Sequence, residues 1–88
     1  MDLKDLKYLV AVYEAKNIMH ASISLATVQS NVSNRIGRLE ERLEAKLFVR
    51  HRRGVTATKK GDLLYRYAKD VLGKIAEAAH MVKDRDAA

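Results

Sequence analysis

The chain has 88 residues, which is enough for one small domain but not for two. Its 48% hydrophobic and 32% charged residues are typical of a globular protein and argue against disorder, and the absence of cysteine excludes disulfides and Cys-based zinc sites. The longest uncharged stretch, residues 17–34, is rich in polar side chains, so it resembles neither a membrane span nor the core of a signal peptide. We therefore expect a cytoplasmic protein.

The net charge of +6 is confined to one segment. Cations and anions balance in residues 1–45, with six of each, and in residues 61–88, with five of each. The whole excess consists of six cations between residues 46 and 60, a segment without any acid: Lys46, Arg50, Arg52, Arg53, Lys59 and Lys60. Such a cluster is either an ordinary solvated surface or a patch that attracts a polyanion, nucleic acid or anionic lipid.

Hydrophobic periodicity predicts a first helix over Leu3–Ala15. Asp2 can cap this helix, and Asp5 follows three residues later, near the positive end of the helix dipole. One helical stripe contains its large apolar side chains: Leu3, Leu6, Leu9, Val10 and Tyr13. Residues 16–17 are expected to form a turn.

A short second helix is expected over residues 19–25, and a third helix after Thr27, which we expect to be its N-cap. The apolar residues of the third helix recur every three or four positions and should face inward: Val28, Val32, Ile36, Leu39 and Leu43. Because only a few residues join these two helices, they should form a helix-turn-helix pair.

The opposite face of the third helix is polar and uncharged until Glu41. Ser30, Ser33, Asn34 and Gly37 follow one another at helical spacing, with Gln29 and Asn31 beside them. Exposed helix faces usually carry lysine and glutamate, whereas Gln, Asn and Ser side chains can read base edges in DNA. An ordinary polar surface is the alternative. Gly37 weakens the helix and has no evident role in the core, so it would allow another surface to approach closely.

The pattern then changes to two short runs that suit strands, residues 47–49 and 55–58, around a glycine-containing turn that suggests a hairpin. A final helix of about 28 residues should begin at Lys59 or Lys60 and be capped by Thr58. Its apolar stripe is too long for its own domain to cover, which favours a partner helix from a second copy. The stripe consists of Leu64, Tyr67, Ala68, Val71, Ile75, Ala78 and Val82.

The predicted fold is therefore mainly α: a winged helix-turn-helix of three helices and a two-stranded β-hairpin wing, followed by a long linker or dimerisation helix. We assign residues 1–58 to the winged helix-turn-helix and residues 59–88 to the long final helix.

Five motifs, at residues 25–36, 38–40, 47–50, 53–55 and 58–61, together resemble the amino-terminal DNA-binding domain of LysR-type transcriptional regulators. The resemblance covers nearly the whole chain. It implies a winged helix-turn-helix, a dimer formed through linker helices, a tetramer for the full-length protein, and a carboxy-terminal domain that binds a small-molecule effector. That domain would follow Ala88, so we expect this chain to be a fragment without a cofactor of its own.

Carried over by position, the resemblance assigns base reading to the start of the third helix: Gln29, Ser30, Asn31, Ser33, Asn34 and Arg35. It implies phosphate contacts for Arg50 and Thr58, a wing contact for Arg52, and a minor-groove contact for Arg53. The expected dimerisation residues are Leu64, Tyr67, Val71, Ile75 and Val82. Glu44 stands where the family commonly has glycine, which puts the usual left-handed cap of that helix in question.

The leading functional hypothesis is a bacterial transcription regulator that binds double-stranded DNA in a sequence-specific way as a dimer. We expect RNA polymerase as a further partner and the nucleoid as the location of the protein. Two alternatives stay open: a non-specific architectural DNA-binding protein and a winged-helix protein-interaction module. An enzyme is not expected, because the serines lack a His and carboxylate pair at suggestive spacing and no glycine-rich phosphate loop is present. His20, His51 and His80 are too far apart in sequence to predict a metal site.

Overall fold

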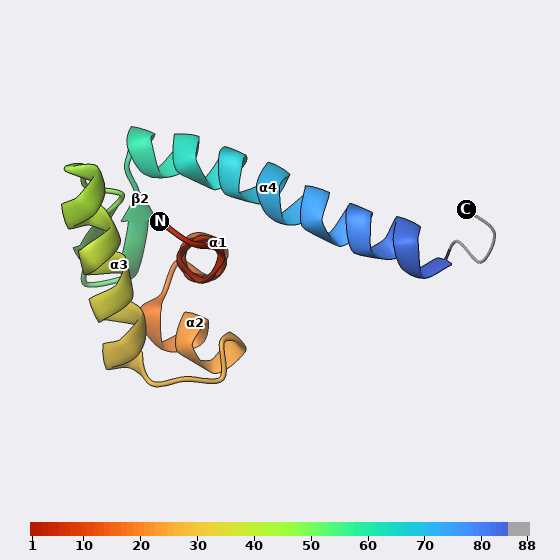
Figure 1. Cartoon of the computed structure of the whole chain (residues 1–88). Helices are drawn as coiled ribbons and strands as arrows, with labels where there is room; N and C mark the ends of the chain where they lie inside the picture. The colour runs from red at the N-terminus through yellow and green to blue at the C-terminus, as the bar shows by residue number, and fades with distance from the viewer. Residues whose placement is uncertain (85–88) are drawn as a thin grey trace.

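The computed structural model describes residues 1–84 and has the predicted architecture of four helices and one hairpin (Figure 1). In chain order the elements are α1 (Leu3–Ala15), α2 (Ile18–Ser24), α3 (Gln29–Leu43), β1 (Phe48–His51), β2 (Gly54–Ala57) and α4 (Lys59–Asp84). This arrangement confirms the winged helix-turn-helix followed by a long helix.

Helix α1 lies at the centre of the domain, with α2, α3 and α4 around it (Figure 1). The predicted cap is present as a complete capping box, in which Asp2 and Asp5 each accept a hydrogen bond from the backbone amide of the other. Leu9 and Val12 are fully buried against the other helices. Leu3 belongs to the predicted apolar stripe but is exposed, because it lies at the start of the helix, beyond the packed part.

The helix-turn-helix pair begins one residue earlier than predicted, because Asn17 caps α2 through its side chain. The expected cap of α3 was wrong: the N-cap is Val28, without a side-chain hydrogen bond, while the Thr27 hydroxyl accepts a hydrogen bond from the Asn31 amide. The middle of the predicted inward stripe of α3 is buried. Its two ends, Val28 and Leu43, are exposed, because the helix only touches the core between them.

Helix α3 ends at Leu43, and its C-cap residue Glu44 adopts the left-handed conformation with φ of 52°. The amide of Ala45 donates to the Glu40 carbonyl oxygen at 3.1 Å, as in a Schellman-type cap. The cap therefore forms without the glycine that is common at this position. The strain of a non-glycine residue in this conformation is offset by the hydrogen bonds that close the helix.

The wing is an antiparallel hairpin in which His51 pairs with Gly54 across a two-residue turn, Arg52 and Arg53. Gly54 has φ of 135°, and a side chain there would collide with the Lys16 carbonyl oxygen, so only glycine fits. On the other side, the Glu40 carboxylate accepts hydrogen bonds from the amides of Leu47 and Phe48, at 2.8 and 3.2 Å. These contacts hold the wing at a defined position beside α3.

Helix α4 starts at Lys59, and Thr58 caps it as predicted by accepting a hydrogen bond from the Gly61 amide at 3.0 Å. Its first half packs into the core of residues 1–58, with Gly61 and Ala68 buried. After Leu72, α4 extends past the rest of the molecule, as Figure 1 shows, and gives it a longest dimension of 53 Å. None of the helices among residues 1–84 is long and apolar enough to span a membrane.

Candidate nucleic-acid interface

The amino-terminal half of α3 presents an exposed surface of uncharged hydrogen-bonding groups. Gln29, Ser30 and Asn34 are exposed, and Ser33 is half-buried beside them. The acids of this helix, Glu40 and Glu41, lie in its second half. Because a helix amino terminus also carries a partial positive charge, this half of α3 favours an anion more than its carboxy-terminal half does.

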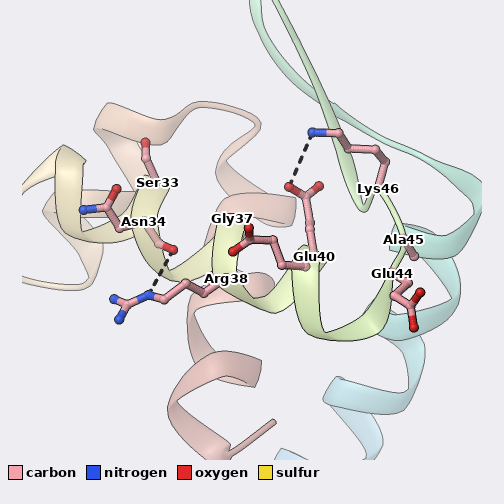
Figure 2. A pocket seen from close by; sticks show the side chains of 9 residues that line it. Ser33, Asn34, Gly37, Arg38, Glu40, Glu44, Ala45 and Lys46 are labelled. Atoms are coloured by element: carbon pink, nitrogen blue, oxygen red, sulfur yellow. Dashed lines mark hydrogen bonds and ion pairs between the residues drawn. The ribbon is translucent and has the colours of Figure 1, made fainter.

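A hollow runs along the exposed side of α3, and Figure 2 shows Ser33, Asn34, Gly37 and Arg38 on its wall. A second hollow, between α3 and the wing, is bordered by Arg50 and also by Gly37. Apart from its own helix, no part of residues 1–84 comes within 4 Å of the place where a Cβ of residue 37 would lie. Gly37 lines both hollows, which we call together the groove between α3 and the wing.

All six cations of the net positive excess have exposed side chains. Arg52 and Arg53 form the tip of the wing, where the Arg53 amide donates to His51 Nδ1 at 3.2 Å and His51 Nε2 lies 2.8 Å from the Thr56 hydroxyl. Lys46, at the base of the wing, is 3.9 Å from a Glu40 oxygen, which is a weak and largely solvated contact (Figure 2). Of these cations, Lys46 and Arg50 thus lie beside the middle of α3, across a hollow that Ile36, Gly37 and Glu40 also line.

Two of the six residues expected to read bases point away from this groove. The guanidinium of Arg35 lies 2.8 Å from the Asp5 carboxylate and stacks over the Tyr8 ring, whose centroid is 5.2 Å away. The Asn31 amide donates to the Tyr8 hydroxyl at 3.0 Å and to Thr27. Both side chains face α1 because they lie next to the buried stripe of α3, so they orient this helix.

Asp5 is the buried charge to which α3 is attached, with 3% of its surface exposed. Burial by itself raises the pKa of its carboxyl group, but the hydrogen bond from the Asp2 amide and the hydrogen bond and charge of Arg35 outweigh this effect. The net result is a pKa below the ordinary value. Arg42, 3.6 Å from the same carboxylate, adds to the attraction, so Asp5 stays ionised and holds α3 at two points.

The hydroxyl of Thr58, expected at a phosphate, is already engaged within the protein. It donates to the Lys46 carbonyl oxygen at 2.6 Å while it caps α4. Thr58 therefore ties the base of the wing to the start of α4.

The residues expected to form a dimer divide between two faces of α4. Leu64 packs partly buried against the core of its own domain, whereas Tyr67, Val71, Ile75 and Val82 are exposed. Leu63, which the sequence analysis did not select, is also exposed and precedes Tyr67 by one helical turn. We define the α4 stripe as the exposed set Leu63, Tyr67, Val71, Ile75 and Val82.

Arg38 is a candidate interface residue that the sequence analysis missed. Its exposed side chain lies along the same face as Asn34, whose carbonyl oxygen is 3.4 Å from Arg38 Nε (Figure 2). The signal was available, since Arg38 follows Asn34 by four residues and such residues share a helix face. Lys46 borders the same hollow.

Residues 3–62 match the model of the family described as bacterial regulatory helix-turn-helix protein, lysR family. The chain is 38% identical over 78 residues to the HTH-type transcriptional regulator GltR of Bacillus subtilis (strain 168). This aligned region covers 89% of this chain and 26% of GltR. The chain is 44% identical over 78 residues to the regulator YofA of Bacillus velezensis (strain DSM 23117 / BGSC 10A6 / LMG 26770 / FZB42), covering 89% of this chain and 27% of YofA. The chain thus spans about a quarter of the length of these relatives.

Solved structures agree with this result. The BenM DBD/catB site 1 DNA complex has a TM-score of 0.92 at 33% identity and covers 100% of this chain and 99% of that one. The CbnR DBD–DNA complex has a TM-score of 0.87 at 28% identity, and the match covers 94% of this chain and 95% of that one. Together with the match over residues 3–62, these likenesses show that the chain belongs to the lysR family of bacterial regulatory helix-turn-helix proteins.

Proposed function

We propose that this chain is the DNA-binding domain of a transcription regulator and binds double-stranded DNA in a sequence-specific way. The observation that carries this function is the exposed, uncharged hydrogen-bonding surface on the amino-terminal half of α3, together with the exposed wing cations that lie beside the middle of the same helix. Two similar solved structures, which cover 100% and 94% of this chain, are complexes with DNA, and this supports the proposed function.

In this proposal α3 enters the major groove, where Gln29, Ser30, Ser33 and Asn34 meet base edges. The amides of Gln29 and Asn34 each offer a donor and an acceptor, so either can pair with adenine through two hydrogen bonds. Arg38 extends this set. Asn31 and Arg35 take no direct part, because their polar groups are bound to α1 and to the turn before α3.

The wing supplies contacts that depend on charge more than on sequence. Arg50, Arg52 and Lys46 neutralise phosphates, and Arg53, at the tip, enters the adjacent minor groove. Thr58 supports the wing from below, through its bond to the Lys46 carbonyl oxygen.

The α4 stripe extends this proposal to a homodimer on two half-sites. Its large side chains lie on one face of a helix that projects beyond its own domain, and burying them against a second copy removes apolar surface from water. For the whole protein, we extend the proposal to a tetramer, a small-molecule effector bound by a further domain, contact with RNA polymerase, and a cytoplasmic, nucleoid-associated location.

Selection of bound sequences from a random duplex pool tests the function. We expect a consensus with dyad-related halves, and expect Gln29→Ala and Asn34→Ala each to change the preferred base at single positions, by about 1 to 3 kcal/mol of discrimination. Asp70→Asn, on the exposed side of α4, is the control and should keep the consensus. Binding without a consensus would favour an architectural protein, and absence of DNA binding would favour a protein-interaction module.

A further inference from the structure

Two tyrosines stack face to face between α1 and α4. The rings of Tyr13 and Tyr65 are 9° from parallel, and their centroids are 3.7 Å apart. Each hydroxyl donates a hydrogen bond to a carboxylate of the opposite helix: Tyr13 to Asp62 at 2.8 Å, and Tyr65 to Glu14 at 2.7 Å. These four residues form a crossed set of contacts, which we call the tyrosine clamp.

The charges around the tyrosine clamp keep both hydroxyls in the donating form. The hydrogen bond to Asp62 raises the pKa of Tyr13, and the hydrogen bond to Glu14 raises the pKa of Tyr65. In turn, the hydrogen bond from Tyr65 lowers the pKa of Glu14, which also lies 3.4 Å from the Lys69 ammonium. At neutral pH both tyrosines are thus donors, and Glu14 is an ionised acceptor.

The tyrosine clamp lies on the part of α4 that packs on α1, before the helix projects. The remaining contacts here come largely from Ala68, Leu64 and Leu72 on the α4 side, and apolar packing of this kind has little directional preference. Hydrogen bonds, by contrast, weaken steeply when their angle changes. The crossed pair therefore opposes both a rotation of α4 about its axis and a tilt against α1.

From this geometry we infer that the tyrosine clamp fixes the direction in which α4 leaves the domain, and so determines which spacing between two DNA half-sites a dimer accepts. Tyr13, Glu14, Asp62 and Tyr65 are then positioning residues for operator specificity, although none of them touches DNA. The inference rests on the proposed dimer through α4, because only in that dimer does the direction of α4 relate two copies of α3.

The size of the domain makes this effect large enough to matter. A tilt of about 10° moves a point 25 Å from the tyrosine clamp, the width of the molecule, by about 4 Å. The rise of one base pair is about 3.4 Å. A small change in the direction of α4 therefore shifts the far side of the domain by about one base pair, and the two-fold symmetry of a dimer doubles the shift.

A series of duplexes tests this inference. Each duplex carries two copies of the selected half-site, with the distance between them changed by one base pair at a time. A further duplex carries one half-site. We expect the wild-type protein to prefer one spacing by at least tenfold over its neighbours. In the double variant Tyr13→Phe/Tyr65→Phe, which keeps the stacked rings and removes both hydroxyls, this preference should fall to about threefold or less.

Single half-site affinity should stay within about twofold of wild type in the double variant, because the DNA-facing surface is unchanged. Asp62→Asn weakens one acceptor and should give an intermediate spacing profile. Glu77→Gln, further along α4 and on the opposite side of the helix from Val71, Ile75 and Val82, is the matched control and should keep the wild-type profile. Thermal unfolding of each variant shows that the change in profile does not come from loss of fold.

The results separate this inference from the function on which it rests. A double variant that binds one half-site normally and keeps the sharp wild-type preference would overturn the role of the tyrosine clamp and leave the dimer intact. A wild-type protein that binds single half-sites but shows no preferred spacing would overturn the dimer and the inference together. Sequence-specific binding by α3 would survive both results.

Discussion

Replacing Gly37 by alanine should stabilise the protein and, at the same time, weaken its binding to DNA. Glycine in the middle of a helix is less favourable than alanine by about 1 kcal/mol. The backbone of Gly37 is helical, and apart from its own helix nothing in residues 1–84 lies within 4 Å of the added methyl group. The melting temperature should therefore rise by about 4 to 8 °C, the shift that 1 kcal/mol produces in a domain of this size.

The DNA affinity should change in the opposite direction. The methyl group would stand in the groove between α3 and the wing, where we place the DNA, and would hold α3 away by a distance comparable to one bond length. Hydrogen bonds to base edges near 2.9 Å would then stretch beyond the range in which they are strong. We expect the affinity for a single half-site to fall about tenfold, or roughly 1.4 kcal/mol.

Gly73 provides a matched control within the same chain. It is also a helical glycine, it lies on α4, and its added methyl group likewise meets nothing in the described part of the chain outside its own helix. Gly73→Ala should raise the melting temperature to a similar extent and leave half-site binding unchanged. Thermal unfolding and fluorescence anisotropy with a labelled half-site duplex measure both quantities. If Gly37→Ala binds the half-site as tightly as wild type, close approach of DNA to Gly37 is refuted.

Three further predictions concern charges and the α4 stripe. Asp5 has a lowered pKa, so its contribution to stability is present above the ordinary pKa of 3.8 and is lost as the pH falls below that value. Asp5→Asn should lower the free energy of unfolding by about 2 to 3 kcal/mol at pH 7 and reduce the acid dependence of unfolding. An unchanged urea midpoint at pH 7 would contradict this. Arg53→Ala should weaken DNA binding more on A/T-rich than on G/C-rich flanks, and equal losses on both flanks would refute the minor-groove contact of Arg53. Arg50→Ala should weaken binding to all sequences alike and reduce the slope of log affinity against log salt concentration by about one. An unchanged slope would refute the phosphate contact of Arg50. Val71→Asp places a carboxylate in the α4 stripe, so sedimentation should show monomers where wild type is dimeric, and a wild-type protein that is monomeric at high micromolar concentration would refute the dimer.

Local patterns in the sequence were sufficient for the elements and their order. The periodic apolar residues of α1 and α3, the capping pair Asp2 and Asp5, the cap at Thr58 and the glycine turn of the wing each reflect interactions within a few residues. Such interactions join residues that are close together in the sequence, so the helix-turn-helix, the hairpin and the long helix follow from them. The clustering of positive charge on the wing could be predicted for the same reason, because all its residues lie within one short segment.

Tertiary packing decided which polar side chains are free to act. Asn34 and Arg35 are adjacent and equally suited to DNA in sequence, but the rotation of about 100° per helical residue directs Arg35 to a buried aspartate from α1 and leaves Asn34 exposed. In the same way, Tyr13 and Tyr65, which are 52 positions apart in the sequence, meet only because α4 packs against α1. Periodicity identifies the face of each helix but not its partner, because the partner depends on how all the helices pack around one core.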